Sequence, residues 1–325
     1  MPSDNTHYRT GLTLVETLVS LAIIGILVAI LIPAIQATRE AARRTQCQGN
    51  IRQTAIALHN FHTAKDSLPS QYNETSLAYP LNEWDLFHMH SWRAVLLPYI
   101  EQSALHDSVD WKTLATDPEN DSIATTVVST YVCPSGPSPS SNTGSFARHD
   151  RSSEYQAVRS DYDGLAGIWD IFEDPPIGTL DGTTRYLRWS AWGSATFDDG
   201  TVSGNMSRYN AGKFSEVTDG LSNTILLAER AGRPKHLVNG QPAVTRDNPN
   251  ADYLGQIAWS ASNPFVWRIN FRDTVINQDN AYGGLYSFHS GGASIARADG
   301  SVAFLNESTD FVALKQMIGR SDGEP

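Results

Sequence analysis

The stretch GLTLVETLVSLAIIGILVAILIPAIQAT, residues 11–38, is almost entirely apolar and contains one charged side chain, Glu16. Thr17 to Thr38 are 22 residues without a charge, which would span about 33 Å as an α-helix, enough to cross a bilayer. A secretory signal peptide has a shorter apolar region followed by a cleavage site, and this stretch has neither feature. The sequence therefore predicts a membrane helix, spanning about residues 14–36, that stays attached to the chain.

Glu16 lies close to the start of this predicted helix. A carboxylate at the edge of an apolar span is costly in lipid unless it finds a cationic partner, so such residues usually have a function. The alternative is that Glu16 simply reaches the headgroups, because it lies within a turn and a half of the helix start. The carboxylate itself is compatible with both interpretations.

The string GLTLVE, residues 11–16, resembles the leader junction of type IV prepilins and type II secretion pseudopilins. The resemblance implies that residues 1–11 are a leader, and that a prepilin peptidase cuts after Gly11 and methylates the new N-terminal amine of Leu12. It also implies that Glu16 pairs with the N-terminal amine of a neighbouring pilin-like subunit. Pro33 coincides with the helix-kinking proline that many pilins carry.

The same resemblance implies a single-pass protein of the bacterial cytoplasmic (inner) membrane, with its head in the periplasm or at the cell surface. The charges flanking the span favour the opposite orientation, because Arg9 alone precedes it and Arg39, Arg43 and Arg44 follow it. We give the leader motif more weight, since long domains translocate largely regardless of charge.

The predicted helix continues to about residue 63, giving a helical segment 12–63 ahead of a globular head, residues 64–325. Five apolar residues fall at spacings of four, four, three and three, which places them on one helical face that should carry the head: Cys47, Ile51, Ala55, Leu58 and Phe61. His59 and His62, one turn apart, are expected at the boundary of this face.

The head is expected to be rich in β-structure, because short apolar runs alternate with Pro, Gly, Asn and Asp. The predicted fold class is α+β: a long N-terminal helix packed on a large, mostly antiparallel head. Residues 91–111 suggest a short helix interrupted around Pro98, and residues 129–142 a strand followed by a loop. Two hairpins are expected, over residues 214–230 and 293–306.

Both expected hairpins contain an Asp-Gly pair, and the second pair follows His289 after nine residues. With the leader junction, YVCPS (131–135) and TDGLSNT (218–224), this spacing resembles a large bacterial family of pilin-like proteins of unassigned function, sometimes labelled solute-binding. The family-signature residues are interpreted as structural, with the imidazole tying a loop to the sheet and Asp-Gly making the turns: His289, Asp299, Gly300, Asp219 and Gly220. An acid/base pair of His289 and Asp299 is the less favoured alternative.

The two cysteines, Cys47 and Cys133, have no CxxC pattern and no histidine at zinc-site spacing, so no metal site is expected from them. In an exported chain they can form a disulfide, and two buried free thiols are the alternative.

Acidic clusters could contribute to a calcium site, but none has the spacing of an EF-hand loop. Solvated turns are the favoured interpretation of all three clusters: Asp161 and Asp163; Asp117, Glu119 and Asp121; Asp198 and Asp199. No cofactor is expected. Calcium stays open as an alternative, but the sequence does not identify which residues would bind it.

The chain lacks GxSxG, P-loop, HExxH and dinucleotide-binding motifs, and its net charge of -11 argues against a nucleic-acid partner. The predicted function is therefore non-enzymatic. The resemblance implies a membrane-anchored pilin-like protein that can assemble into a filament or pseudopilus. The alternative is a membrane-anchored module that binds a solute or a glycan. That alternative would use stacking tryptophans of the head: Trp169, Trp189, Trp192, Trp259 and Trp267.

Overall fold

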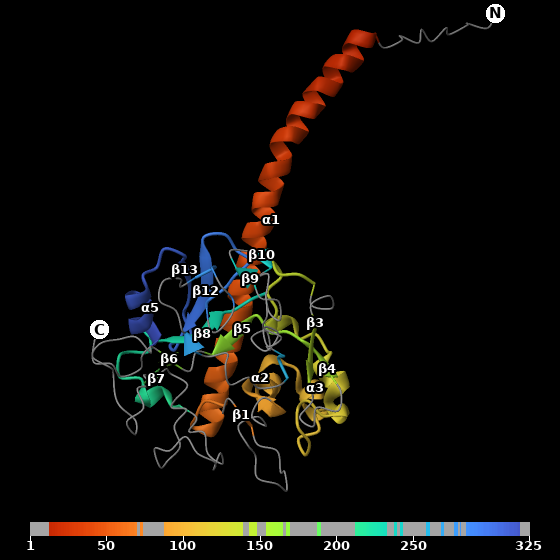
Figure 1. Cartoon of the computed structure of the whole chain (residues 1–325). Coiled ribbons are helices and arrows are strands. Elements are labelled where there is room, and N and C mark those ends of the chain that lie inside the picture. Colours follow the sequence, from red (N-terminus) through yellow and green to blue (C-terminus); the bar gives the residue numbers. More distant parts are fainter. Residues whose placement is uncertain are drawn as a thin grey trace, which may run out of the picture. The chain divides into compact units, whose positions relative to one another are not determined.

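The fold is described from a computed structural model of the whole chain (Figure 1). The chain divides into two compact units, residues 1–43 and residues 44–325, which are described separately. The structure describes the following residues: 13–69, 72–73, 88–138, 143–147, 154–164, 167–169, 187–189, 212–232, 237–238, 241–242, 258–260, 268–269, 276–278, 280 and 284–318.

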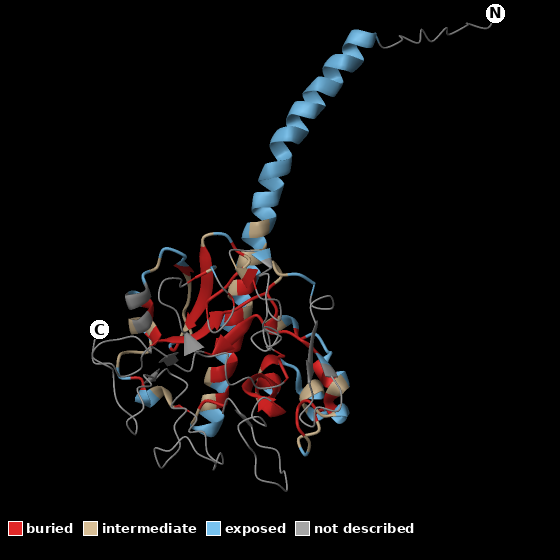
Figure 2. Ribbon diagram, viewed as in Figure 1, coloured by how far each residue is buried: buried red, intermediate tan, exposed pale blue. Residues whose placement is uncertain are grey.

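Helix α1 is one continuous element, Leu14–Lys65, and Pro33 lies within it. Proline has no backbone N–H, so one hydrogen bond of the helix is missing at this position. The large apolar side chains before residue 36 are all exposed, from 45% at Val28 to 78% at Leu14 (Figure 2). This length and hydropathy suit a membrane span, and α1 is the one described helix of that kind.

The later part of α1 belongs to the second unit and buries one face in it (Figure 2). The predicted apolar face is confirmed, because its five residues are all buried. They belong to a core cluster that also contains Trp92, Leu96, Tyr131 and Trp259. The helix is therefore amphipathic only where the head covers it, as expected of a helix that changes environment along its length.

The centre of the head is a four-stranded antiparallel sheet in the order β13-β12-β8-β5 (Figure 1). Its strands are β5 (Tyr162–Gly164), β8 (Ile225–Glu229), β12 (Gly292–Arg297) and β13 (Val302–Asn306). Leu226 and Ala296 belong to the core cluster that includes α1. Ile225 and Ile295 pack instead in a second cluster with helix α5, Phe311–Ile318. Both faces of the central strands are thus buried.

The hairpin predicted over residues 293–306 is confirmed. Arg297 N–H donates to the carbonyl of Ser301 over 2.8 Å, and Gly300 N–H donates to the carbonyl of Arg297 over 2.9 Å. Gly300 has a φ of +83°, a left-handed conformation that glycine adopts without a steric penalty. Asp299 accepts from Ser301 N–H, which closes the turn.

Shorter elements surround this sheet. The interrupted helix predicted around Pro98 is confirmed as three pieces: α2 (Trp92–Leu96), η2 (Leu97–Ile100) and α3 (Ser103–Asp107). The other short helices are η3 (Pro118–Asn120), α4 (Asp121–Ala124), η4 (Ser129–Tyr131) and η6 (Phe214–Glu216). Small sheets pair β1 (Tyr72–Asn73) with β2 (His90–Ser91), β3 (Thr143–Ala147) with β4 (Glu154–Val158), β9 (Leu237–Val238) with β10 (Gln241–Pro242), and β6 (Gly167–Trp169) with β7 (Leu187–Trp189) and β11 (Arg268–Ile269).

Every described strand pair except β6 with β11 is antiparallel, so the predicted α+β fold class with a mostly antiparallel head is confirmed. Two local predictions are wrong. Residues 129–131 form a 3-10 turn instead of a strand, because Tyr131 hydroxyl and Cys133 N–H bond to Arg93 and Asp161 and not to a neighbouring strand. Residues 214–230 form a turn followed by β8, which pairs with β12 and β5 and not with a strand of its own segment.

The two faces of α1 in the head predict different responses to the same substitution. Ile51→Ala removes a fully buried side chain and should lower the free energy of unfolding by about 2–5 kcal/mol. Ile56→Ala, on the same helix, removes a side chain that is 51% exposed and should change it by less than about 0.5 kcal/mol. Urea unfolding of the detergent-solubilised protein compares the two, and equal effects would contradict the burial of this face.

Candidate functional site

The first candidate site is the start of α1, where Glu16 and Thr13 form a reciprocal cap. Thr13 N–H and the Thr13 hydroxyl each donate to Glu16 Oε2 over 2.9 Å, and Glu16 N–H lies 3.3 Å from the same hydroxyl oxygen. This Thr-x-x-Glu arrangement is a capping box, which satisfies backbone donors that the first helical turn leaves without partners. Both bonds to the carboxylate end on Oε2, so Oε1 can accept a further donor.

The predicted processing residues, Gly11 and Leu12, lie outside the described residues. Thr13, the first described residue, is exposed and immediately follows Leu12. The carboxylate of Glu16 is therefore held within one residue of the position where cleavage would create a new amine. Pro33 lies further along the same exposed apolar part of α1.

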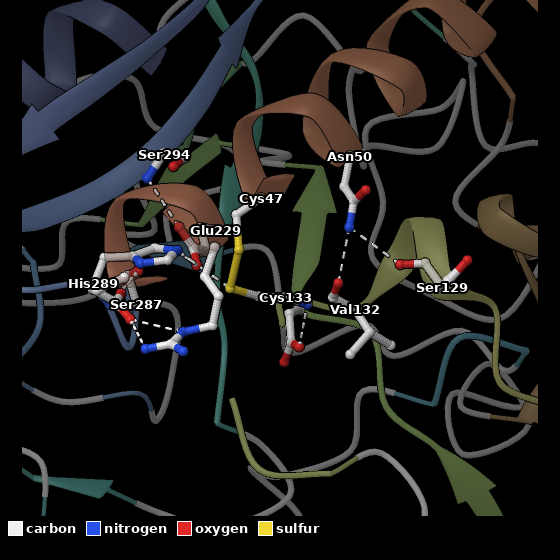
Figure 3. The surroundings of a disulfide bond; sticks show 12 residues. Cys47, Asn50, Ser129, Val132, Cys133, Glu229, Ser287, His289 and Ser294 are labelled. Carbon is white, nitrogen blue, oxygen red and sulfur yellow. Dashed lines mark hydrogen bonds and ion pairs between the residues drawn. A yellow bond between two sulfur atoms is a disulfide. The ribbon is translucent and has the colours of Figure 1, made fainter. Parts of the chain in front are cut away.

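The second candidate site is a buried polar centre in the head, built around a disulfide between Cys47 and Cys133 (Figure 3). The two Cα atoms are 5.2 Å apart, and the bond joins α1 to the loop after η4 across 86 residues of sequence. Asn50, one turn after Cys47, donates to the carbonyls of Ser129 and Val132 over 3.2 and 3.0 Å. Helix and loop are thus held together by a covalent bond and two hydrogen bonds.

Two further buried side chains, His289 and Glu229, converge on this disulfide (Figure 3). His289 Nε2 lies 3.4 Å from Cys133 Sγ and 3.9 Å from Glu229 Oε1. Glu229 Oε2 accepts from Ser294 N–H on β12 over 3.1 Å, whereas Oε1 is buried without a hydrogen-bond partner. Burial raises the pKa of the Glu229 carboxyl to about 7, with the Ser294 bond acting in the opposite direction.

Beside the disulfide lies a buried network of arginines and aspartates, in which Asp163 joins two guanidinium groups. Arg93 Nη2 lies 2.6 Å from Asp163 Oδ1, and Arg230 Nη1 lies 3.1 Å from Asp163 Oδ2. Arg93 also donates twice to the carbonyl of Tyr162. A buried charge is tolerated only when it is paired and hydrogen-bonded, and this network meets that requirement for Asp163.

Asp161 connects the ion-pair network to the disulfide loop. Its Oδ1 accepts from Arg159 Nε and its Oδ2 from Cys133 N–H, each over 2.8 Å. Burial raises the pKa of the Asp161 carboxyl, and Arg159 opposes that shift. The backbone of Asp161 is also bonded on both sides: its N–H donates to the carbonyl of Tyr131, and its carbonyl accepts from Arg230 N–H.

The interpretation of Asp161 and Asp163 as solvated-turn residues is therefore wrong. Both are buried, because Asp163 on β5 and Asp161 directly before it lie in the interior beside three arginines that neutralise them. Asp117, Glu119 and Asp121 are themselves partly or fully exposed and lie over the start of η3 and α4, where Asp117 accepts from Leu114 N–H. Asp198 and Asp199 lie outside the described residues.

The family-signature residues are distributed over two ends of the sheet. His289 precedes β12 and is buried, whereas Asp299 follows β12 and is exposed at the turn. A strand of that length separates its ends by about 20 Å, so the structure does not bring His289 and Asp299 together as an acid/base pair. Asp219 and Gly220 form the turn before β8, and Gly220 has a φ of +98°.

The boundary position predicted for His59 and His62 is confirmed, since both are partly buried. Their rings lie 4.4 and 4.6 Å from the ring of Phe214. His62 Nε2 also accepts from Phe214 N–H over 3.3 Å. The pair ties α1 to η6.

Of the five tryptophans considered for glycan stacking, Trp259 is the one whose side chain the structure describes. Trp259 is fully buried and donates from Nε1 to the carbonyl of Thr126 over 2.8 Å. Trp169 and Trp189 lie on the adjacent strands β6 and β7, and Trp192 and Trp267 lie outside the described residues.

Comparison with known proteins agrees with this geometry. Residues 6–32 match the prokaryotic N-terminal methylation motif, and an apolar helix with the dimensions of a membrane span follows from residue 14. The chain is thus a pilin-like, membrane-anchored protein. Residues 36–312 match the family described as protein of unknown function (DUF1559), and the chain belongs to that family. Neither a curated protein nor a solved structure shows significant similarity to it.

Several residues of these sites are not among those that the sequence patterns above identify. The pattern Thr13-x-x-Glu16 is a visible capping-box signal that identifies Thr13. Arg159 and Asp161 precede β5 and are two positions apart, a spacing that places side chains on one face of an extended segment. Arg93 and Arg230 carried none, since their partners come from distant segments of the chain.

The ion-pair network predicts a large difference between buried and exposed aspartates. Asp163→Asn leaves two buried guanidinium groups without a carboxylate and should lower the free energy of unfolding by about 3–5 kcal/mol. Asp107→Asn removes an exposed carboxylate that contacts His106, and should cost less than about 1 kcal/mol. Urea unfolding of both variants tests this expectation, and a small effect at Asp163 would show that the network does not stabilise the head.

Proposed function

We propose that this protein is a substrate of a prepilin peptidase, anchored in the cytoplasmic membrane, whose apolar helix packs against other pilin-like subunits to form a filament or pseudopilus. Its role in that assembly is to present the head outside the cytoplasm, without catalysis. The observation that carries the proposal is the exposed apolar part of α1, at whose start the Glu16 carboxylate accepts from Thr13 N–H, one residue after the expected new N-terminus.

The Glu16 geometry supports a specific contact between subunits. The capping box fixes the carboxylate at the helix start and leaves Oε1 to accept another donor. An N-terminal amine of a neighbouring subunit is a cation of suitable size, and the pair would remove the cost of two isolated charges near lipid. Because the amine lies at a fixed place on each helix, this contact would set the axial register of the assembly.

The position of the head outside the cytoplasm is supported by the disulfide between Cys47 and Cys133. Disulfides persist in oxidising compartments and are rare where cellular thiols are kept reduced. This observation outweighs the three arginines that follow the span, since long domains translocate largely regardless of flanking charge.

Two substitutions at Glu16 separate capping from subunit pairing. In Glu16→Gln the side-chain oxygen still accepts from Thr13, but the charge is lost; Glu16→Ala loses both. If pairing with an amine drives assembly, both variants should be cleaved normally and should be missing from sheared surface filaments. Filaments of Glu16→Gln at the wild-type level would contradict the charge pair and leave Glu16 as a helix cap.

Processing is predicted to leave a mature chain that begins at Leu12 and carries one N-terminal methyl group. Intact-mass analysis of the protein from a host with a prepilin peptidase measures both changes. Gly11→Val should block cleavage, because the family resemblance assigns the cut to the peptide bond after this glycine. A wild-type chain that still begins at Met1 in such a host would refute the leader assignment.

A further inference from the structure

The buried polar centre contains four potential metal donors from four separate parts of the head: Cys47, Cys133, Glu229 and His289. One ligand atom of each residue lies within 4.8 Å of the corresponding atom of every other. All four residues are buried, with at most 2% of their surface exposed. Closed four-donor sites of this kind are typical of structural metals, whereas catalytic sites keep one position open.

We infer that the reduced head binds a divalent thiophilic cation such as Zn²⁺ through the two cysteine sulfurs, His289 Nε2 and Glu229 Oε1. The disulfide and the metal are then alternative states of one centre, because each uses both sulfur atoms. This inference does not depend on filament assembly and adds a site to the head.

The distances suit a tetrahedral ion. With zinc bonds of about 2.0–2.3 Å, neighbouring donors in a tetrahedron are about 3.3–3.8 Å apart. The observed separations are 3.4 Å from Cys133 Sγ to His289 Nε2 and 3.9 Å from His289 Nε2 to Glu229 Oε1 (Figure 3). Breaking the sulfur–sulfur bond allows the two thiolates to move apart by side-chain rotation to a similar spacing.

The environment of Glu229 Oε1 gives a second reason to place a cation here. Glu229 Oε1 is fully buried, has no hydrogen-bond partner and faces His289 Nε2. An unsatisfied buried acceptor costs about 1–3 kcal/mol, and a cation bound at this oxygen would remove that cost. Glu229 Oε2, held by Ser294 N–H, fixes the orientation of the carboxyl group in the way that second partners orient metal ligands.

The donor chemistry identifies the class of ion. Two sulfurs, one imidazole nitrogen and one carboxylate oxygen suit Zn²⁺ and disfavour Ca²⁺ and Mg²⁺, which take oxygen ligands in larger number. Sequence spacing gives no indication of the site, because the closest pair along the chain, Glu229 and His289, is 60 residues apart. The donors meet only after α1, β8 and the loop before β12 have packed together.

Conversion between the two states is a balanced two-electron reaction. A dithiol reductant transfers two electrons and two protons to the Cys47–Cys133 bond, giving two thiols, and is itself oxidised to a disulfide. The cation then replaces the protons of the two thiols, and that of Glu229 where the carboxyl carries one. Metal affinity should therefore depend on the redox state of the cysteines.

Cobalt binding to the full-length protein in detergent tests the inference. A phosphine reductant opens the disulfide: the disulfide oxidises the phosphine to its oxide, water supplies the oxygen atom and the two thiol protons, and Co²⁺ is then added. Reduced protein should bind one Co²⁺ per chain, with thiolate-to-cobalt charge transfer and the visible absorption of a tetrahedral site, and Zn²⁺ should displace it. Oxidised protein should show neither band. Reduced, folded protein without thiolate-ligated Co²⁺ would overturn the inference.

Single-residue variants identify the ligands. His289→Ala and Glu229→Gln should each weaken Co²⁺ binding at least about 10-fold. Loss of a residue that only hydrogen-bonds to a metal ligand already lowers affinity by about that factor, and loss of a ligand itself should cost no less. His106→Ala, at a partly exposed histidine of α3, is the matched control and should bind as the wild type does. Wild-type affinity in His289→Ala would overturn the assignment.

If reduction of the disulfide unfolds the head, metal binding is measured instead by the refolding that it causes. Zn²⁺ added to reduced wild-type protein should restore its circular dichroism and raise its unfolding midpoint, because metal binding and folding are coupled. The double variant Cys47→Ser, Cys133→Ser lacks both sulfur ligands and should show no such recovery. Failure of Zn²⁺ to restore the wild type, or equal recovery of the double variant, would contradict the site.

Discussion

Burial of one face of α1 in the head is the interaction on which the rest of the structure depends. The side chains of Ile51, Leu58 and Phe61 supply the face against which α2, η4 and the loop after η4 pack. Cys47 and Asn50, on the same stretch, add a disulfide and two hydrogen bonds to that loop. The same helix contains the exposed apolar segment and the face buried in the head, and the apolar pattern changes from uniform to one-sided along its length.

The interior of the head has an unusual number of ionisable groups close to this helix. Three arginines are buried with Asp161, Asp163 and Glu229, and His289 lies beside them. Buried ion pairs contribute little net stability, because desolvation offsets their attraction, but each partner becomes indispensable to the other. Asp161 bonds to Cys133 N–H and Arg159, and so links the position of the disulfide loop to the charge network. The polar centre is thus a set of mutually dependent contacts.

Much of the fold was predictable wherever a local pattern reports a local structure. The buried face of α1 follows from spacings of three and four residues, and the turn between β12 and β13 follows from Asp299-Gly300. Predictions failed where the decisive partner is remote. YVCPS resembles a strand, but its polar groups bond to Asp161 and Arg93. Asp161 and Asp163 resemble solvated residues until β5 brings them beside buried arginines.

The sequence by itself determined the class of protein, the membrane helix and its processing motif, because a hydrophobic run and a leader junction are properties of adjacent residues. The capping box of Thr13 and Glu16 is local in the same sense. Only the tertiary structure decided what surrounds Cys47 and Cys133. Their neighbours His289 and Glu229 are separated from them by long stretches of chain, and such contacts arise when distant segments pack to bury a common core.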